Sequence, residues 1–282
     1  MTYSKKQNFD KFYTKQEVVK QCLKYIDINS YDFVIEPSAG NGSFYSIINH
    51  SNKIGLDIKP EHPDIKCMDW FEYEIAEKYE KVLVIGNPPF GIRNKLSIAF
   101  LEHSCSFNNV FTIAFVLPDV FNKHTLQKHI PKEYRLKHIV KLPNDSFMIE
   151  DKSYHVPCSF FVFEKSYGEC LRFKPELYIE TEHWSYGTKK DYDFFVMGAS
   201  INTVKKCPEN EKNSGYYIKV KNDFDVEIVK DNFKNLKYKS YSSVNGGVAW
   251  LTRPEVVKNY GEQFGGIIPS PNLFNFFLDL SS

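Results

Sequence analysis

The string VIGNPPF, residues 84–90, carries the most specific chemistry in the chain. An apolar run ends there in an asparagine, two prolines and an aromatic ring. Consecutive prolines restrict the backbone and remove N–H donors. The side-chain oxygen of Asn87 and the carbonyl of Pro88 therefore remain as acceptors, with Phe90 as a flat surface beside them. Two acceptors and a ring suit an amino group on a planar base, and the alternative is a rigid turn after a strand.

A second string, FVIEPSAGNGSF at residues 33–44, predicts a strand, a glycine-containing turn and then a helix. Open α/β sheets bind ligands at the carboxyl ends of their strands, where this turn would lie. Gly40 and Gly42 have no Cβ, so a ligand can approach the main chain closely. The third glycine of the dinucleotide fingerprint is missing, which argues against a diphosphate ligand. A purely structural turn is the alternative.

Two acidic residues end the next two predicted strands. Asp57 lies 21 residues after Glu36, about the interval at which an acid meets ribose hydroxyls in nucleoside-binding α/β folds. Asp69 is followed by Trp70, a pair suited to accept from the exocyclic amine of adenine and to cover one face of its ring. Each acid alone would be an ordinary surface residue. Together with the glycine turn, they indicate an adenosine-containing ligand without a diphosphate.

These residues end short apolar runs that alternate with segments of helical length. Runs rich in Val, Ile and Phe without polar alternation suit a sheet that is covered on both faces. The pattern predicts an α/β fold with a doubly wound, seven-stranded, Rossmann-like sheet. We expect its strands at residues 33–36, 53–57, 82–86, 111–117, 138–142 and 158–164, with a weaker strand near 65–68.

The chain changes character near residue 165. Residues 1–165 contain the predicted sheet, whereas residues 166–282 have short runs rich in Tyr, Phe and Val and few long amphipathic patterns. Turn signals occur there at Asn213–Gly215 and Asn245–Gly247. We therefore predict two domains, with a smaller β or α+β domain at residues 166–282.

Composition narrows the class of protein. The chain has 282 residues with 36 basic and 35 acidic side chains, so global charge does not point to a polyanion. Its 42% apolar and 25% charged residues exclude disorder, collagen and coiled coil as global descriptions.

Six cysteines without a CxxC pair, and histidines away from zinc-ligand spacing, predict reduced thiols and no metal site. There is no signal-peptide core and no apolar stretch of about 18 residues, so we expect a soluble cytoplasmic or nuclear protein, neither secreted nor in a membrane.

An ordered set of motifs resembles S-adenosylmethionine-dependent amino-methyltransferases. The set comprises FYT (12–14), EPSAGNG (36–42), LDIKP (56–60), MDW (68–70) and NPPF (87–90). Its order is similar to that of the gamma group of DNA adenine-N6 methyltransferases, and the likeness covers about residues 10–165. In that group a C-terminal domain recognises the target. The resemblance implies a methyltransferase sheet, S-adenosylmethionine as the cofactor, adenine in DNA as the substrate, target recognition by residues 166–282, and a place in restriction-modification.

The resemblance also assigns roles to single residues. It assigns to the cofactor Tyr13, Thr14, Glu36, Ser38, Gly40, Gly42, Asp57, Asp69 and Trp70. It assigns to catalysis Asn87, Pro88, Pro89 and Phe90. Tyr13 and Thr14 would meet the methionine end, Asp57 the ribose, and Asp69 with Trp70 the cofactor's adenine. Phe90 would stack on one face of the target base, and Phe147 in KLPNDSFM is the candidate for its other face.

The implied reaction needs no covalent intermediate. Acceptors that hold both N–H groups of the amine favour its pyramidal form, so direct in-line transfer depends mainly on positioning and charge. In duplex DNA the adenine must first leave the stack, which costs a few kcal/mol and is offset by aromatic stacking in the pocket.

Alternatives remain open at this point. RNA is the main rival substrate, because the stretch NPPFGIRNKLSIAFLEHS (87–104) is also similar to the rRNA-adenine branch. The C-terminal part, residues 166–282, is also small for a domain that reads a DNA sequence. The NPPF motif also occurs in methyltransferases that act on protein glutamine. A catalytically silent nucleic-acid-binding module is a third reading. Pro157-Cys158 has the form of a cytosine-C5 nucleophile motif, but it begins the last predicted strand, and we expect a core cysteine there.

Lysines and aromatic residues gather only in the C-terminal part. They are Lys219, Lys221, Lys230, Lys234, Lys237 and Lys239, among Tyr216, Tyr217, Phe233, Tyr238 and Tyr241. Such a mixture can stack bases and contact phosphates, although a solvated β surface has the same composition.

Overall fold

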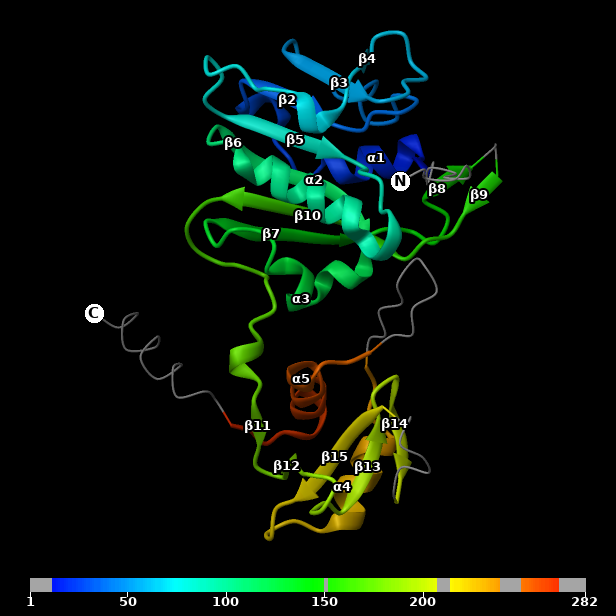
Figure 1. The fold of residues 1–282 in the computed structure, drawn as a ribbon, viewed down its shortest axis with the longest axis vertical. Coiled ribbons are helices and arrows are strands. Elements are labelled where there is room, and N and C mark those ends of the chain that lie inside the picture. Colours follow the sequence, from blue (N-terminus) through cyan, green and yellow to red (C-terminus); the bar gives the residue numbers. More distant parts are fainter. Residues whose placement is uncertain (1–11, 150–151, 207–213, 239–249, 269–282) are drawn as a thin grey trace, which may run out of the picture. The chain divides into compact units, whose positions relative to one another are not determined.

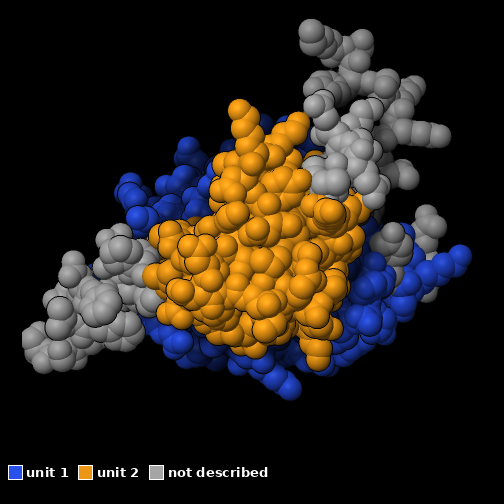
Figure 2. All heavy atoms as spheres, turned by 90° about the horizontal axis from the view of Figure 1, so that it is seen from below, with its two compact units in different colours: residues 1–173, 243–245 blue, residues 174–242, 246–282 orange. Residues whose placement is uncertain are grey.

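The structure is a computed structural model that describes residues 12–149, 152–206, 214–238 and 250–268. The described residues divide into two compact units, one comprising residues 12–173 and the other residues 174–238 and 250–268. Each unit has its own sheet (Figure 1) and its own buried hydrophobic clusters, and Figure 2 shows the two units in different colours.

The first unit is built on a seven-stranded sheet with the order β4-β3-β2-β5-β6-β10-β7. Its strands are β2 (Phe33–Glu36), β3 (Lys53–Asp57), β4 (Lys66–Cys67), β5 (Val82–Gly86), β6 (Val110–Pro118), β7 (Tyr134–Lys141) and β10 (Cys158–Lys165). Neighbours from β4 to β6 are parallel, whereas β10 is antiparallel to both β6 and β7. Every strand overlaps a predicted apolar run, which confirms the seven-stranded α/β sheet.

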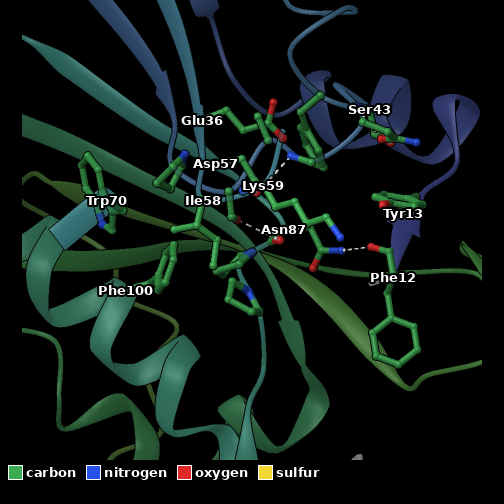
Figure 3. Close-up of a pocket in the computed structure, with 18 of the residues that line it drawn as sticks. Phe12, Tyr13, Glu36, Ser43, Asp57, Ile58, Lys59, Trp70, Asn87 and Phe100 are labelled. Atoms are coloured by element: carbon green, nitrogen blue, oxygen red, sulfur yellow. Dashed lines mark hydrogen bonds between the residues drawn. The ribbon is translucent and has the colours of Figure 1, made fainter. Parts of the chain in front are cut away.

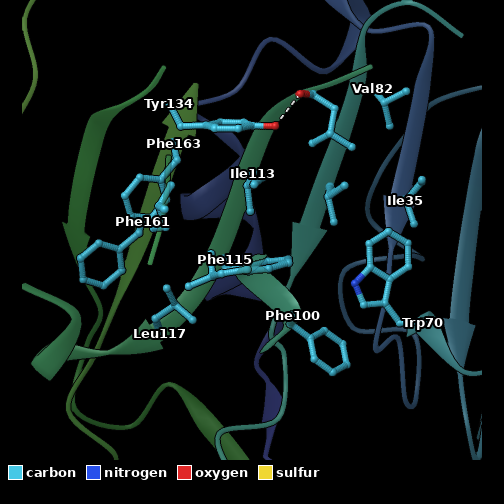
Figure 4. Packing of buried hydrophobic residues seen from close by; sticks show 14 of the residues in the cluster. Ile35, Trp70, Val82, Phe100, Ile113, Phe115, Leu117, Tyr134, Phe161 and Phe163 are labelled. Carbon is cyan, nitrogen blue, oxygen red and sulfur yellow. Dashed lines mark hydrogen bonds between the residues drawn. The ribbon is translucent and has the colours of Figure 1, made fainter. Parts of the chain in front are cut away.

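Side chains on the two faces of this sheet form separate cores. On β5, Val82 and Val84 pack with Phe100 of α2 (Lys95–Ser106) in one cluster. Leu83 and Ile85, which alternate with them, belong to the other cluster together with residues of α1 (Gln16–Leu23). Helices therefore cover both faces, as predicted for a doubly wound sheet. Figure 4 shows the first of these clusters.

The expected helix after the glycine turn is absent from the described structure. Residues 40–47 instead form consecutive turns, in which Ser46 N donates to Gly42 O at 2.9 Å and Ile48 N donates to Phe44 O at 3.0 Å. Gly40 and Gly42 have φ values of 51° and 83°, so the turn itself has the left-handed backbone that favours glycine. The prediction of a helix at this place was therefore wrong.

Shorter elements complete the first unit. They are β8 (Phe147–Ile149), β9 (Lys152–Tyr154), α3 (His124–Gln127) and the 3₁₀ turns η1 (Ile28–Ser30), η2 (Trp70–Glu72), η3 (Ile92–Asn94) and η4 (Asp119–Asn122). A small sheet of order β1-β8-β9 joins β1 (Tyr13–Thr14) to the segment after β7. In it, Thr14 pairs with Phe147 and Tyr13 with Met148. This pairing brings the N-terminal motif to the carboxyl edge of the large sheet.

The second unit is α+β, which confirms the predicted smaller domain class. Its antiparallel sheet has the order β12-β15-β13-β14, and β11 pairs separately with β16. The elements are η5 (Pro175–Leu177), β11 (Glu180–Thr181), β12 (Trp184–Tyr186), β13 (Phe194–Met197), β14 (Ser200–Lys205), β15 (Gly215–Val220), α4 (Val226–Lys234), α5 (Arg253–Phe264) and β16 (Ile267–Ile268). Trp184, Phe233 and Tyr260 are among the buried residues that join the sheet to the two helices.

The first unit extends beyond the predicted boundary at residue 165, because the chain after β10 folds back onto it. Leu171 N donates to Leu136 O at 2.9 Å, and the Arg172 guanidinium donates to the carbonyls of Ile130 and Pro131, each at 2.9 Å. Phe173 N donates to the side-chain oxygen of Gln127 at 3.1 Å. Residues 166–173 thus belong to the first unit, and the units divide at Phe173.

Truncation tests whether residues 166–173 stabilise the first unit. A chain that ends at Lys165 is expected to unfold at a lower temperature than a chain that ends at Phe173. Loss of the Arg172 hydrogen bonds removes about 1–3 kcal/mol, and each kcal/mol corresponds to roughly 2–4 °C at this size. Thermal unfolding followed by circular dichroism compares the two chains. Equal melting temperatures would show that residues 166–173 contribute nothing to the first unit.

Candidate functional site

A cavity of about 270 Å³ lies in the first unit, where β2, β3 and β5 end. Most of the predicted site residues line it: Tyr13, Thr14, Glu36, Ser38, Gly40, Asp57, Asp69, Trp70, Asn87, Pro88, Pro89 and Phe90. Because parallel strands end at the same sheet edge, motifs far apart in the sequence meet here. In Figure 3, Trp70, Ile58 and Phe100 lie toward one end of the cavity, and Phe12 and Tyr13 toward the other.

Two predicted residues lie outside this cavity. Gly42 lines a neighbouring hollow that it shares with Tyr13 and Thr14. Phe147 has no exposed surface and belongs to the hydrophobic core on the α1 side of the sheet. Neither residue is therefore in direct reach of a ligand in the cavity as it stands.

Asp57 fixes the glycine turn. One of its carboxylate oxygens accepts from Gly40 N at 2.8 Å, and the other accepts from Lys59 N at 2.8 Å. A carboxylate oxygen has two lone pairs, so each still has one acceptor position for a hydroxyl group. Ser38 Oγ in the same turn donates to the main-chain oxygen of Asn87 at 3.2 Å. The two motifs are thus joined directly.

Glu36 is a buried carboxyl group at the end of β2, with only 3% of its surface exposed. Burial raises its pKa well above the ordinary value, the charge of Asp57 raises it further, and a hydrogen bond from the backbone of Tyr45 opposes the shift. Its Oε2 atom has no hydrogen-bond partner among the described residues. A buried acceptor of this kind suits a ligand that brings a cationic group or a donor.

Asn87 has a fixed side-chain orientation. Its Nδ2 atom donates to the main-chain oxygen of Phe12 at 2.9 Å. Because that partner can only accept, the amide cannot be turned around, and Oδ1 must point elsewhere. Oδ1 is buried and finds no partner in the described part of the chain, as is also true of Thr14 Oγ1. Three buried acceptors without partners, on Thr14, Glu36 and Asn87, therefore line one cavity.

The end of the cavity that is expected to hold adenine differs in detail from the prediction. Asp69 accepts from Phe71 N at 3.0 Å and begins η2. Trp70 is 1% exposed and packs edge-on against His103 at a centroid distance of 5.0 Å, so it is mainly a core residue. Ile58, by contrast, is 56% exposed and Phe71 is 42% exposed, and both line the cavity.

Sequence reasoning missed these apolar lining residues, together with Leu96 and Phe100. A signal was present for two of them, because Ile58 directly follows Asp57 and Phe71 directly follows Trp70. Large apolar side chains just after an acid that ends a strand are unusual in a solvated turn. They are better explained as a surface that contacts the faces of a planar ring.

The two rings predicted for the target base are both covered. Phe90 is 2% exposed and Phe147 is 0% exposed. Phe12 stacks on Phe90 with a centroid distance of 5.9 Å and an interplanar angle of 24°, and it meets Phe147 edge-on at 6.2 Å. Phe12 opens the FYT motif but was not among the predicted site residues.

The lysine-rich segment of the second unit is largely compensated by acidic residues. Ion pairs join Lys219 to Asp191 and Asp193, Lys221 to Glu180, Lys230 to Glu227, and Lys234 to Asp231. Phe233 is fully buried in the core of this unit. Lys239 and Tyr241 lie outside the described residues. The paired lysines lend little support to a phosphate-binding surface at this place.

Other candidate chemistry receives no support. Cys158 is buried at the start of β10, and burial raises the pKa of its thiol. A buried neutral thiol in a central strand is a core residue, not a nucleophile. Among the described residues, no group of three His, Cys, Asp or Glu side chains could hold a metal ion. The same part of the chain contains no helix with the length and apolar character of a membrane span.

Comparison with known proteins gives no family model and no curated relative that matches the sequence. Among solved structures, a putative RNA methyltransferase from Pyrococcus horikoshii is 17% identical, with 54% of this chain and 82% of that chain covered and a TM-score of 0.39. A chain of a type I restriction-modification system is 16% identical, with 95% and 65% covered and a TM-score of 0.42. Magnesium protoporphyrin IX methyltransferase from Synechocystis with bound S-adenosylmethionine is 11% identical, with 54% and 79% covered and a TM-score of 0.38.

Proposed function

We propose that the protein is an S-adenosylmethionine-dependent methyltransferase that modifies the N6 amine of adenine in DNA, an activity of the kind found in restriction-modification. The observation that carries this proposal is the fixed orientation of the Asn87 side chain and its oxygen, which is unpartnered among the described residues. Its amide nitrogen is held by Phe12 O, while its oxygen is buried, has no partner among the described residues, and lines the cavity of the glycine turn. An oriented acceptor beside a nucleoside-type site suits an amine that must be held during transfer.

The chain's own groups suit the cofactor. Glu36 and Thr14 offer buried acceptors for the methionine end, and Asp57 offers acceptor positions for the ribose. Ile58 and Phe71 present apolar surface for the adenine ring, and Asp69 lies beside them. When bound, S-adenosylmethionine supplies a methyl group on a cationic sulfur.

Asn87 and Pro88 act on the substrate amine. Hydrogen bonds from the amine to the Asn87 oxygen and the Pro88 carbonyl hold its protons, so that the nitrogen lone pair is drawn out of conjugation with the ring. Because Asn87 is pre-oriented by Phe12, little reorganisation is needed when the base arrives. The two prolines keep this backbone from turning away.

Gly40 provides a test of the cofactor site. A Cβ at Gly40 would lie 3.1 Å from Cε1 of Tyr13, and its φ of 51° already disfavours a side chain. Gly40→Ala is expected to weaken S-adenosylmethionine binding roughly tenfold, because the turn must shift at a cost of about 1–2 kcal/mol. Isothermal titration calorimetry measures the affinity. Gly168→Ala is the matched control, since Gly168 has a φ of 95° and a Cβ there would meet no described atom within 4 Å, so the substitution adds backbone strain away from the cavity.

If both variants bind the cofactor as the parent does, the glycine turn does not contact it. If both lose affinity equally, the effect is one of general stability, which thermal unfolding of the two variants reveals independently.

RNA is the second candidate substrate. It is favoured by the similarity of residues 87–104 to rRNA-adenine enzymes. Equal masses of DNA and RNA in one reaction, with a labelled methyl donor, distinguish the two. We expect the label in the fraction that DNase degrades. Label confined to the RNase-sensitive fraction would assign the enzyme to RNA, and label in neither would remove the nucleic-acid assignment.

A further inference from the structure

Three groups converge on one residue, Phe12: Asn87, which the proposed function assigns to the target amine, and Phe90 and Phe147, which the family resemblance assigns to the faces of the target base. The Phe12 ring stacks on Phe90 at 5.9 Å and touches the edge of Phe147 at 6.2 Å. Its main-chain oxygen accepts from the side chain of Asn87 at 2.9 Å. Phe12 itself is only half-buried and lines the cavity.

The geometry leaves no open ring face for a base on Phe90. With 2% of its surface exposed, Phe90 is covered by the core and by Phe12, and Phe147 is wholly covered. An aromatic base that stacks on Phe90 needs a ring-sized space against it. In this structure Phe12 is the cavity-lining ring that stacks there.

We propose that the Phe12 ring is a gate that fills the base slot in the closed state, and that a purine base enters by displacing this ring. The inference rests on the proposed function, because it takes Phe90 and Asn87 as the groups that receive the base. The gate makes the site selective, because an entering base must displace the Phe12 ring from its place against Phe90. Small or non-planar groups gain too little stacking to displace it.

The backbone around Phe12 suits a side-chain gate. The next residues are anchored, because Tyr13 and Thr14 pair with Met148 and Phe147 in the β1-β8 ladder, and Lys15 N donates to Ser146 O at 2.9 Å. Phe12 itself precedes the first ladder pair. Rotation of its ring can therefore open the slot while its carbonyl keeps Asn87 oriented.

The test measures binding and not transfer. A single-stranded deoxyadenosine oligonucleotide presents adenine without a recognition sequence or an unpairing cost, and an oligonucleotide of the same length with abasic sites reports the contribution of the backbone. Fluorescence anisotropy gives both dissociation constants for the full chain. Phe12→Ala is expected to bind the adenine strand about 2–10-fold more tightly, the worth of one aromatic stacking contact, and to bind the abasic strand as the parent does.

Two further variants keep the result interpretable. Phe12→Leu is expected to bind the adenine strand with an affinity between those of the parent and of Phe12→Ala. If Phe12→Ala does not fold, the affinity of Phe12→Leu tests the gate. Phe111→Ala removes another half-buried phenylalanine from the same core, outside the cavity, and is expected to change neither affinity.

Unchanged or weaker adenine binding in both Phe12 variants would overturn the gate. Because no methyl transfer is measured, this outcome is distinct from failure of the proposed function. If the Phe12 variants gain adenine affinity but the protein transfers no methyl group, the gate stands and the proposed methyltransferase function does not. If the protein transfers methyl groups but the variants gain no adenine affinity, the proposed function stands and the gate does not.

Discussion

Asn87→Ala is expected to lower the rate constant of methyl transfer by about 10²–10³-fold, the usual effect of removing one preorganised polar group from a reacting centre. The substitution removes a side-chain acceptor next to Pro88 that is buried, oriented and without a partner among the described residues. Cofactor affinity should change little, because Ser38 contacts the main chain of Asn87 and not its side chain. Single-turnover transfer of a labelled methyl group measures the rate directly.

Asn122→Ala is a matched control for this experiment. Asn122 is also half-buried and also donates its side-chain amide to a main-chain oxygen, that of Asp119 at 3.0 Å, but it lies outside the cavity. We expect it to transfer at the parental rate. If Asn87→Ala transfers as fast as Asn122→Ala, the amine is not held by Asn87, and the proposed mechanism does not stand.

Glu36→Gln is expected to stabilise the cofactor-free protein at neutral pH and to weaken cofactor binding. The pKa of Glu36 is raised in the folded state by burial. Between the ordinary pKa of a glutamate and this raised value, the folded protein holds a proton that the unfolded chain has released. Stability of the parent therefore falls as pH rises through that window, and glutamine removes this slope.

Cofactor binding should respond in the opposite direction. The methionine end of S-adenosylmethionine carries an ammonium group, and a hydrogen bond from this group favours the ionised form of Glu36. Affinity of the parent should rise with pH through the raised pKa, whereas Glu36→Gln should bind about 10–100-fold more weakly at high pH, the range for a charge-assisted hydrogen bond. Denaturant unfolding and calorimetric titration across pH measure the two trends. A parental pH profile in the glutamine variant would mean that titration of Glu36 does not cause the pH dependence of cofactor binding, and the role of Glu36 in the cofactor site would not stand.

Much of the fold was predictable because its signals are local. Apolar runs such as residues 82–86 are short and rich in Val and Ile without polar alternation, which is typical of strands that are buried on both faces of a sheet. Once the strands are known, parallel order brings Glu36, Asp57 and Asn87 to one edge without further information. The seven strands and the shared cavity follow from this reasoning.

The parts that escaped prediction depend on contacts between distant segments. Phe12 lies in the base slot because the neighbouring strand β1 pairs with β8. No sequence pattern near residue 12 predicts that pairing. Lys219 looks like a free cation in the sequence but pairs with Asp191 across the second unit's sheet. Residues 166–173 join the first unit through hydrogen bonds of Arg172 to carbonyls that lie some forty residues earlier.

The identity of the methylated atom tests the central claim most directly. The purified full chain is incubated with methyl-labelled S-adenosylmethionine and DNA, the DNA is digested to nucleosides, and the labelled nucleoside is identified by mass spectrometry, with Asn87→Ala in parallel. We predict that N6-methyldeoxyadenosine carries the label and that the variant yields little of it. Label on cytosine, or equal N6-methyldeoxyadenosine from parent and variant, would contradict an adenine-N6 methyltransferase that works through Asn87.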